Sequence, residues 1–131
     1  MERNEKTRAL LAAFGCALAY LLVGKALTAV LPQVPEEAAR MWAFVHRCAA
    51  APIVEELVFR GIIQQLARPL GERQAVALQA VLFAVQHRGP AGMAYALVCG
   101  LVLGTLRSRT GSVWPGMLLH TLNNLLVFAA G

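Results

Sequence analysis

The stretch Glu55-Glu56-Leu57-Val58-Phe59-Arg60 decides the fold, because it places three ionisable side chains inside a long apolar segment. An ionisable side chain at the centre of a membrane helix costs about 2.5–3.5 kcal/mol on insertion scales. A chain that keeps several of them needs compensating partners on the same helix or on neighbouring helices. The stretch therefore predicts a helical bundle built around a polar centre.

The composition indicates an integral membrane protein. Hydrophobic residues make up 58% of the 131 residues, charged residues make up 15%, and the mean hydropathy is +0.58. An average domain has about 25% charged residues, so this chain has too few to cover a surface that faces water. The length fits a single domain, 1–131. The net charge of +5 is spread over short connections and forms no basic stripe, so nucleic acid is not an expected partner.

Five helical segments are predicted, at about 7–31, 38–67, 73–87, 91–106 and 113–131, with a turn at 68–73. Prolines, glycines and charged residues separate these segments. Sustained period-two alternation is absent, which argues against strands. The expected fold class is all-α: a polytopic membrane bundle of about five helices.

The second predicted segment is unusually long. At 1.5 Å per residue it reaches roughly 45 Å, against about 30 Å for the hydrocarbon core of a bilayer. It also contains Pro52, which removes a backbone donor and should free the carbonyl of Cys48. We expect this helix to tilt, to kink or to divide at the proline.

The two glutamates are expected to differ. Glu56 and Arg60 are four residues apart with the carboxylate on the N-terminal side, the better order for an ion pair along a helix. Glu55 points about 100° away from Glu56 around the helix axis, so the same arginine serves it less well. Two adjacent carboxylates in a low-dielectric site rarely both ionise. We expect Glu56 to be charged and paired, and Glu55 to exchange protons.

Three further polar side chains lie within apolar segments or at their ends. His87 closes the third segment, and His120 and Asn124 are four residues apart on one face of the fifth. Each of them alone is as often a satisfied buried group as a functional one. Together with the acidic stretch in one small bundle, they indicate a site that does chemistry.

The fourth segment carries a ridge of small side chains, because Gly92, Ala96, Gly100 and Gly104 recur every four residues. Such ridges let helix backbones approach closely in a bilayer, where no hydrophobic drive acts between helices. We expect this ridge to pack within the monomer. Oligomerisation would use the same device.

The distribution of basic residues predicts a multi-pass protein of the cell membrane with its N-terminus in the cytoplasm. If all five segments cross the bilayer, Arg40 and Arg88 fall on the outer side and seven others on the inner side. Those seven are Arg3, Lys6, Arg8, Arg68, Arg73, Arg107 and Arg109. His87 then lies near the outer end of the third helix.

The polar residues also resemble three motifs of one known family, the CAAX protease and bacteriocin-processing family, called CPBP or Abi. Residues 55–60 (EELVFR) match its EExxxR motif, 83–87 (FAVQH) its FxxxH motif, and 120–124 (HTLNN) its HxxxN motif. Each motif alone is common, but three in order on successive hydrophobic helices are specific. The resemblance covers about 42–128.

This resemblance implies a CAAX endopeptidase-like core that hydrolyses a peptide bond of a peptide or membrane-protein substrate inside the lipid bilayer. The catalytic residues that it implies are Glu55, His87, Glu56, Arg60, His120 and Asn124. Glu55 and His87 would activate a water molecule, and Glu56 and Arg60 would support the site. His120 and Asn124 would complete the pocket or stabilise the oxyanion. A carboxylate can take a proton from water and return it to the leaving amine. Donors beside a developing oxyanion lower the barrier most where bulk water is excluded.

A zinc ion is the alternative to a metal-free mechanism. Members of the family are often described as metalloproteases, although the sequence has no HExxH motif. Glu55, His87 and His120 could hold Zn²⁺ and leave one position open. A metal-free glutamate mechanism uses the same residues and is favoured only slightly.

The expected function is an intramembrane endopeptidase in peptide or protein C-terminal processing, or in bacteriocin processing and immunity. The alternative is a non-catalytic immunity or scaffold protein of the same fold, although every motif residue is present. A proton-coupled transporter would use the Glu and His residues as a relay, but five helices without an inverted repeat disfavour it.

Overall fold

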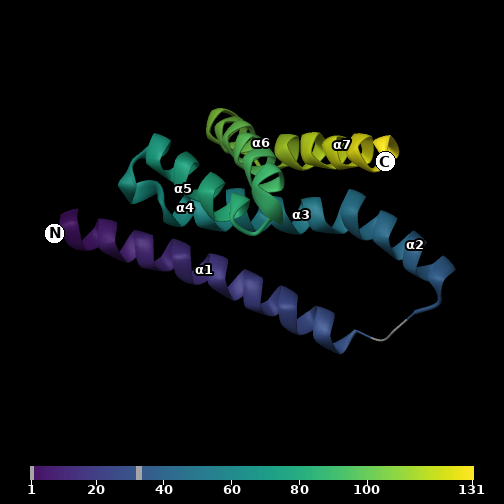
Figure 1. Ribbon diagram of the computed structural model, residues 1–131. Coiled ribbons are helices and arrows are strands. Elements are labelled where there is room, and N and C mark those ends of the chain that lie inside the picture. The colour runs from purple at the N-terminus through teal and green to yellow at the C-terminus, as the bar shows by residue number, and fades with distance from the viewer. Residues whose placement is uncertain (1, 32–33) are drawn as a thin grey trace.

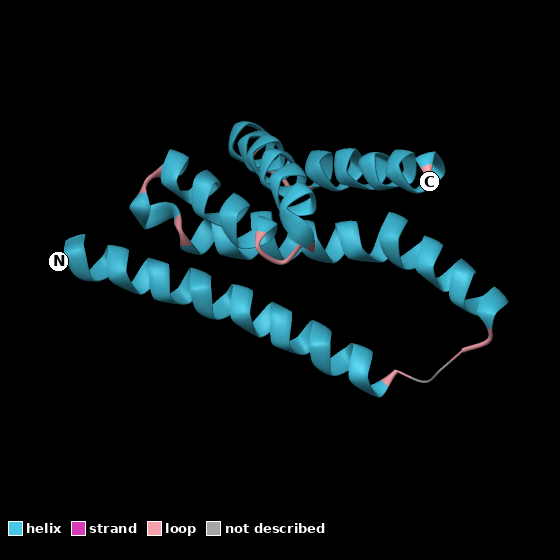
Figure 2. Ribbon diagram, viewed as in Figure 1, coloured by secondary structure: helices cyan, strands magenta, loops and turns pink. Residues whose placement is uncertain are grey.

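Five helical segments make up the part of the chain that this computed structural model describes, residues 2–31 and 34–131, and no strand occurs there (Figure 1, Figure 2). The elements are α1 (Glu2–Val30), α2 (Glu36–Val45), η1 (His46–Ala50), α3 (Ala51–Glu55), η2 (Glu56–Ile63), α4 (Gln64–Leu66), η3 (Arg68–Leu70), α5 (Glu72–Ala84), α6 (Gly89–Thr110) and α7 (Trp114–Ala130). Elements α2 to α4 follow one another without a break as one long helix, in which η1 and η2 are π-helical. The predicted all-α fold is confirmed.

Several helix ends differ from the sequence-based boundaries. The first helix begins at Glu2 instead of residue 7, and the third ends at Ala84, before His87. The fourth runs from Gly89 to Thr110 instead of 91–106. A proline fits the first turn of α6, where no backbone donor is needed, and Gly111 ends the helix with a left-handed φ of 70°.

Helix α1 packs against the long helix through small residues. Its buried positions are Ala9, Ala13 and Ala17, one every four residues, while Leu11 on another face is 68% exposed. The ring of Tyr20 meets that of Phe59 edge to face, with centroids 5.5 Å apart. Large exposed apolar side chains of this kind suit a helix whose outer face meets lipid.

The small-residue ridge of α6 packs within the monomer, as expected. A Cβ on Gly100 would lie 2.9 Å from Cα of Ala80 in α5, and a Cβ on Gly104 would clash with Nε2 of Gln79. That amide donates to the carbonyl of Gly100 at 2.7 Å. The ridge therefore admits both a neighbouring backbone and a buried glutamine.

Two of the described helices, α1 and α6, are long and apolar enough to cross a membrane. The 13 residues of α5 reach only about 20 Å at 1.5 Å per residue, less than the hydrocarbon core. The charge count that assumed five full crossings is therefore not supported by the length of α5.

Candidate active site

The helix that carries the acidic pair is continuous through Pro52 and does not divide there. In the preceding π turn the N–H of Ala51 donates to the carbonyl five residues back. Pro52 has no N–H to continue this pattern to the carbonyl of Arg47. That carbonyl accepts from Nδ2 of Asn124 at 2.8 Å instead. The sequence predicts that Pro52 frees the carbonyl of Cys48. The carbonyl that bonds to a neighbouring helix is instead that of Arg47, one residue earlier.

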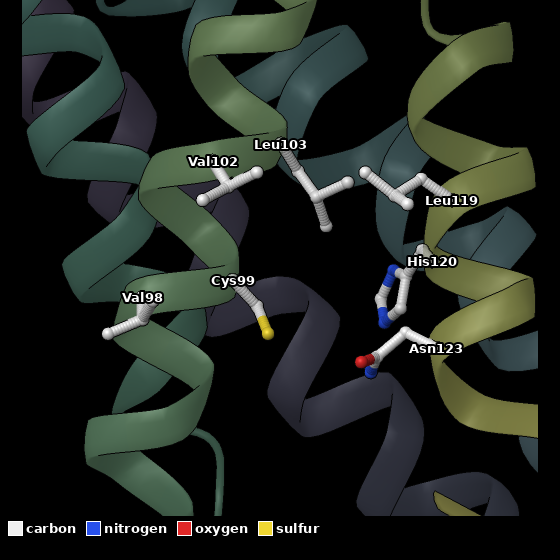
Figure 3. Close-up of a pocket in the computed structure, with 7 residues that line it drawn as sticks. All are labelled: Val98, Cys99, Val102, Leu103, Leu119, His120 and Asn123. Atoms are coloured by element: carbon white, nitrogen blue, oxygen red, sulfur yellow. The ribbon is translucent and has the colours of Figure 1, made fainter. Parts of the chain in front are cut away.

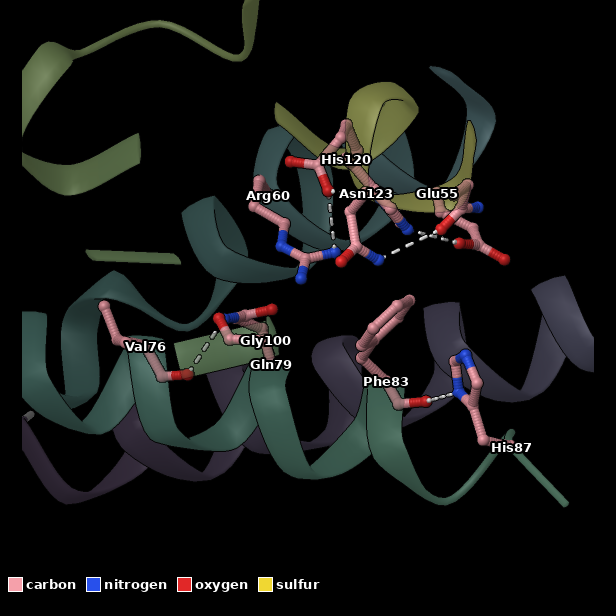
Figure 4. A network of polar contacts seen from close by, with 11 residues as sticks. Glu55, Arg60, Val76, Gln79, Phe83, His87, Gly100, His120 and Asn123 are labelled. Atoms are coloured by element: carbon pink, nitrogen blue, oxygen red, sulfur yellow. Dashed lines mark hydrogen bonds and ion pairs between the residues drawn. The ribbon is translucent and has the colours of Figure 1, made fainter. Parts of the chain in front are cut away.

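Glu56 is fully buried and joins two helices. Its Oε1 lies 3.1 Å from Nη1 of Arg60 and accepts a hydrogen bond from Nδ1 of His120 at 3.0 Å. The ion pair predicted from the four-residue spacing is present. Arg60 is also fully buried, and its guanidinium carbon lies 4.4 Å from the centre of the Phe83 ring (Figure 4). The ring face supplies the cation with a second favourable contact.

Helix α7 comes close to this buried carboxylate at Gly116. A Cβ at that position would lie 2.5 Å from Oε2 of Glu56. A larger residue would push the carboxylate away from Arg60 and His120. Sequence reasoning did not single out this glycine, because nothing local shows which residue faces it.

Glu55 lies on the other side of the same imidazole. Its Oε2 is 3.6 Å from Nε2 of His120, which is within ion-pair range but too long for a direct hydrogen bond. Nδ1 of His120 carries a proton, because it faces the carboxylate of Glu56. A further proton can be carried either by Nε2 or by Glu55. Both placements give the centre of two glutamates, Arg60 and His120 no net charge, which suits an apolar surrounding.

His87 lies in the turn that follows α5, where its ring folds back over the last helical turn. Its Nδ1 is 3.0 Å from the carbonyl oxygen of Phe83 (Figure 4). A carbonyl oxygen only accepts, so Nδ1 carries the proton and Nε2 of the neutral ring keeps a lone pair. The ring of Phe83 contacts both histidines, with centroid distances of 4.7 Å to His87 and 5.8 Å to His120.

One cavity of about 660 Å³ collects most of the predicted catalytic side chains. It is lined by Glu55, His87, His120 and Asn124, together with His46 and Arg47 of η1. Glu56 and Arg60 do not line it and are buried instead. The structure thus separates the predicted residues into four that line the cavity and a buried ion pair, Glu56 and Arg60, that bonds to one of the four, His120.

A second, smaller cavity of about 180 Å³ lies between α6 and α7, and its walls are almost wholly apolar (Figure 3). Cys99 and Leu103 line it from α6, and His120 and Asn123 line it from α7. His120 therefore borders both cavities.

Two residues that the sequence analysis passed over connect to Asn124. The hydroxyl of Tyr95 donates to Oδ1 of Asn123, and Nδ2 of Asn123 donates to Oδ1 of Asn124 at 3.4 Å. The available signal was Asn123 beside Asn124, because an amide inside an apolar helix needs partners.

A comparison with protein families places the chain. The pattern that describes the type II CAAX prenyl endopeptidase Rce1-like family matches residues 37–126, more than half of the 131 residues. The chain belongs to this family. The predicted relation to CAAX proteases is thereby confirmed, and the chain is a membrane-embedded helical bundle of the CAAX-type intramembrane endopeptidases, with a peptide or protein substrate. No curated protein and no solved structure matches the chain.

The zinc site considered for this family does not fit the side chains as they are placed. Within residues 2–31 and 34–131, no three His, Cys, Asp or Glu side chains converge as metal ligands. Both ring nitrogens of His120 face carboxylates, Glu56 at 3.0 Å and Glu55 at 3.6 Å. Zinc binding by Glu55, His87 and His120 stays a prediction, and no step below depends on it.

Proposed function

We propose that this Rce1-like chain hydrolyses a peptide bond inside the bilayer with a water molecule that Glu55 and His87 activate without a metal. The observation that carries this proposal is that Oε2 of Glu55 lies 3.6 Å from Nε2 of His120 at the wall of the large cavity, with Nδ1 of the same ring bonded to Glu56. A carboxylate that can gain or lose a proton without changing the net charge of its surroundings is suited to general acid–base work.

In the first step the proton resides on Nε2 of His120 and Glu55 is ionised. Glu55 accepts a proton from the water while the water oxygen bonds to the scissile carbonyl carbon. His87 orients the water, because its free Nε2 accepts the second water hydrogen. The products of this step are a protonated Glu55 and a tetrahedral oxyanion.

The oxyanion needs donors, and α7 supplies two. Nε2–H of His120 is one, and its charge is stabilised by Glu56 behind it. Asn124 is the other, because its Nδ2 carries two protons and only one is used on the carbonyl of Arg47. Removing one such donor typically lowers kcat by about 10²- to 10³-fold.

In the last step the carbon–nitrogen bond breaks and Glu55 returns its proton to the leaving amine. The new carboxylic acid and the amine leave, and Glu55 is ionised again. Atoms and protons balance with water as the only co-substrate.

The proposed biological setting is the maturation of a peptide or the C-terminal processing of a protein, including bacteriocin processing and immunity. Membership of a CAAX-type endopeptidase family supports a peptide substrate that is reached from the membrane. We propose that the chain resides in the cell membrane as a multi-pass protein.

The test is cleavage of a randomised peptide library by the protein reconstituted in lipid vesicles. The new N-termini are mapped by mass spectrometry for the wild type and for Glu55→Gln, which keeps the size of the side chain and removes its charge. We expect a set of cleavage sites that disappears in Glu55→Gln. Equal cleavage by both proteins would overturn the proposal, and so would no cleavage by either.

A further inference from the structure

We infer that Tyr95 and Asn123 are positioning residues that keep an N–H group of Asn124 directed at the cavity. This inference rests on the proposed function, in which Asn124 stabilises the oxyanion. Tyr95 lies outside the three sequence motifs, Asn123 occupies a variable position of the third, and neither lines the large cavity.

The contacts form a chain across three elements. The Tyr95 hydroxyl in α6 donates to Oδ1 of Asn123 in α7, and Nδ2 of Asn123 donates to Oδ1 of Asn124 at 3.4 Å. Nδ2 of Asn124 then donates to the carbonyl of Arg47 in η1 at 2.8 Å. Asn124 is therefore held on both sides of its amide group.

These contacts allow only one orientation of the Asn124 amide. Rotating it by 180° would bring its Nδ2 against the Nδ2 of Asn123, and its Oδ1 against the carbonyl oxygen of Arg47. The first pair consists of two donors and the second of two acceptors, so both hydrogen bonds would be lost. In the observed orientation the second N–H of Asn124 stays available to the cavity that its side chain lines.

The wrong orientation would harm catalysis directly. It would present a carbonyl oxygen where the developing oxyanion needs a donor, and two negative oxygens repel each other in a low-dielectric site. Tyr95 matters because its hydroxyl anchors the side chain of Asn123, whose Nδ2 then meets Oδ1 of Asn124. The hydroxyl thus acts on the reaction through two asparagines.

The experiment is a double-mutant cycle on a peptide that the wild type cleaves in the library. It measures kcat and KM for the wild type, Tyr95→Phe, Asn124→Ala and the double variant. We expect Tyr95→Phe to lower kcat about two- to tenfold, the size of one neutral hydrogen bond, with KM unchanged. In the Asn124→Ala background the same change should have no further effect.

Thr105→Val is the control, because it removes from the same helix, α6, an exposed hydroxyl that bonds to the carbonyl of Leu101 and does not line the large cavity. It should leave kcat unchanged. An equal loss from Tyr95→Phe in both backgrounds, or an increase in KM alone, would overturn the positioning role and leave the proposed function standing. A wild type that cleaves no peptide would overturn both.

Discussion

His120 and Glu56 are hydrogen-bonded across two helices, with Nδ1 of the imidazole 3.0 Å from Oε1 of the carboxylate, and both side chains are buried. This bond ties α7 to the long helix and decides which ring nitrogen faces Glu55 and the cavity. It also explains why two adjacent glutamates differ. Glu56 is committed to Arg60 and His120, whereas Glu55 remains accessible to water.

Glu56→Gln should destabilise the protein strongly. It leaves the guanidinium of Arg60 fully buried without its carboxylate, and removing one partner of a buried ion pair typically costs about 3–5 kcal/mol. Unfolding in mixed detergent measures the change. The control is Glu2→Gln, which removes a carboxylate with the same four-residue spacing to Lys6 at an exposed position. Equal unfolding midpoints for the two variants would show that the buried ion pair stabilises the protein no more than the exposed one.

Gly100→Ala should also destabilise the bundle, because its new Cβ would press on the backbone of Ala80 at 2.9 Å. Overpacking of this kind typically costs about 1–3 kcal/mol. Gly15→Ala is the control, since nothing lies within 4 Å of a Cβ there and alanine has the higher helix propensity. The measurement is the free energy of unfolding of each variant. An unchanged free energy of unfolding in Gly100→Ala would mean that α5 and α6 do not pack as described.

Sequence spacing could predict the contacts that depend on one helix. Glu56 and Arg60 pair as expected, because positions four residues apart lie on one face. The position of His120 between both glutamates could not be predicted in the same way. It depends on how closely α7 crosses the long helix, which in turn depends on Gly116.

The end of α5 shows a second limit of local reasoning. Apolar periodicity continues to His87, but the helix stops at Ala84 and the N–H of His87 bonds to the Ala84 carbonyl in a tight turn. The bond between Tyr95 and Asn123 could not be predicted either, because it joins residues that lie 28 positions apart on two helices.

Treatment of the protein with a metal chelator should leave its peptide cleavage rate unchanged. The proposed mechanism uses Glu55, His87 and His120 as proton carriers and donors, and these side chains do not converge as a metal site in the described chain. Cleavage is measured before and after treatment with 1,10-phenanthroline, and the zinc content of the purified protein is determined. Stoichiometric zinc that is lost together with activity in His87→Ala would reject the metal-free mechanism.

The large cavity should open on the side of the membrane away from the cytoplasm. Arg8 lies beside Leu66 and Pro69, and Arg73 lies beside Arg109, at the end of the bundle away from His87. These basic residues outnumber Arg47 and Arg88 at the cavity end. Such residues favour the cytoplasmic side.

This orientation can be read by labelling single cysteines in a variant without Cys16, Cys48 and Cys99. A membrane-impermeant maleimide should label Arg88→Cys on intact cells, and Arg109→Cys only after lysis. The reverse pattern would place the cavity on the cytoplasmic side.

The most direct test of the central claim is a single turnover of a cleaved peptide in ¹⁸O-labelled water. If Glu55 activates water, one ¹⁸O atom enters the new carboxyl group of the product and none enters Glu55. Mass spectrometry of the product and of the enzyme peptide that contains Glu55 reports both. Label found in Glu55 would show that its carboxylate attacks the substrate itself, and would contradict the account.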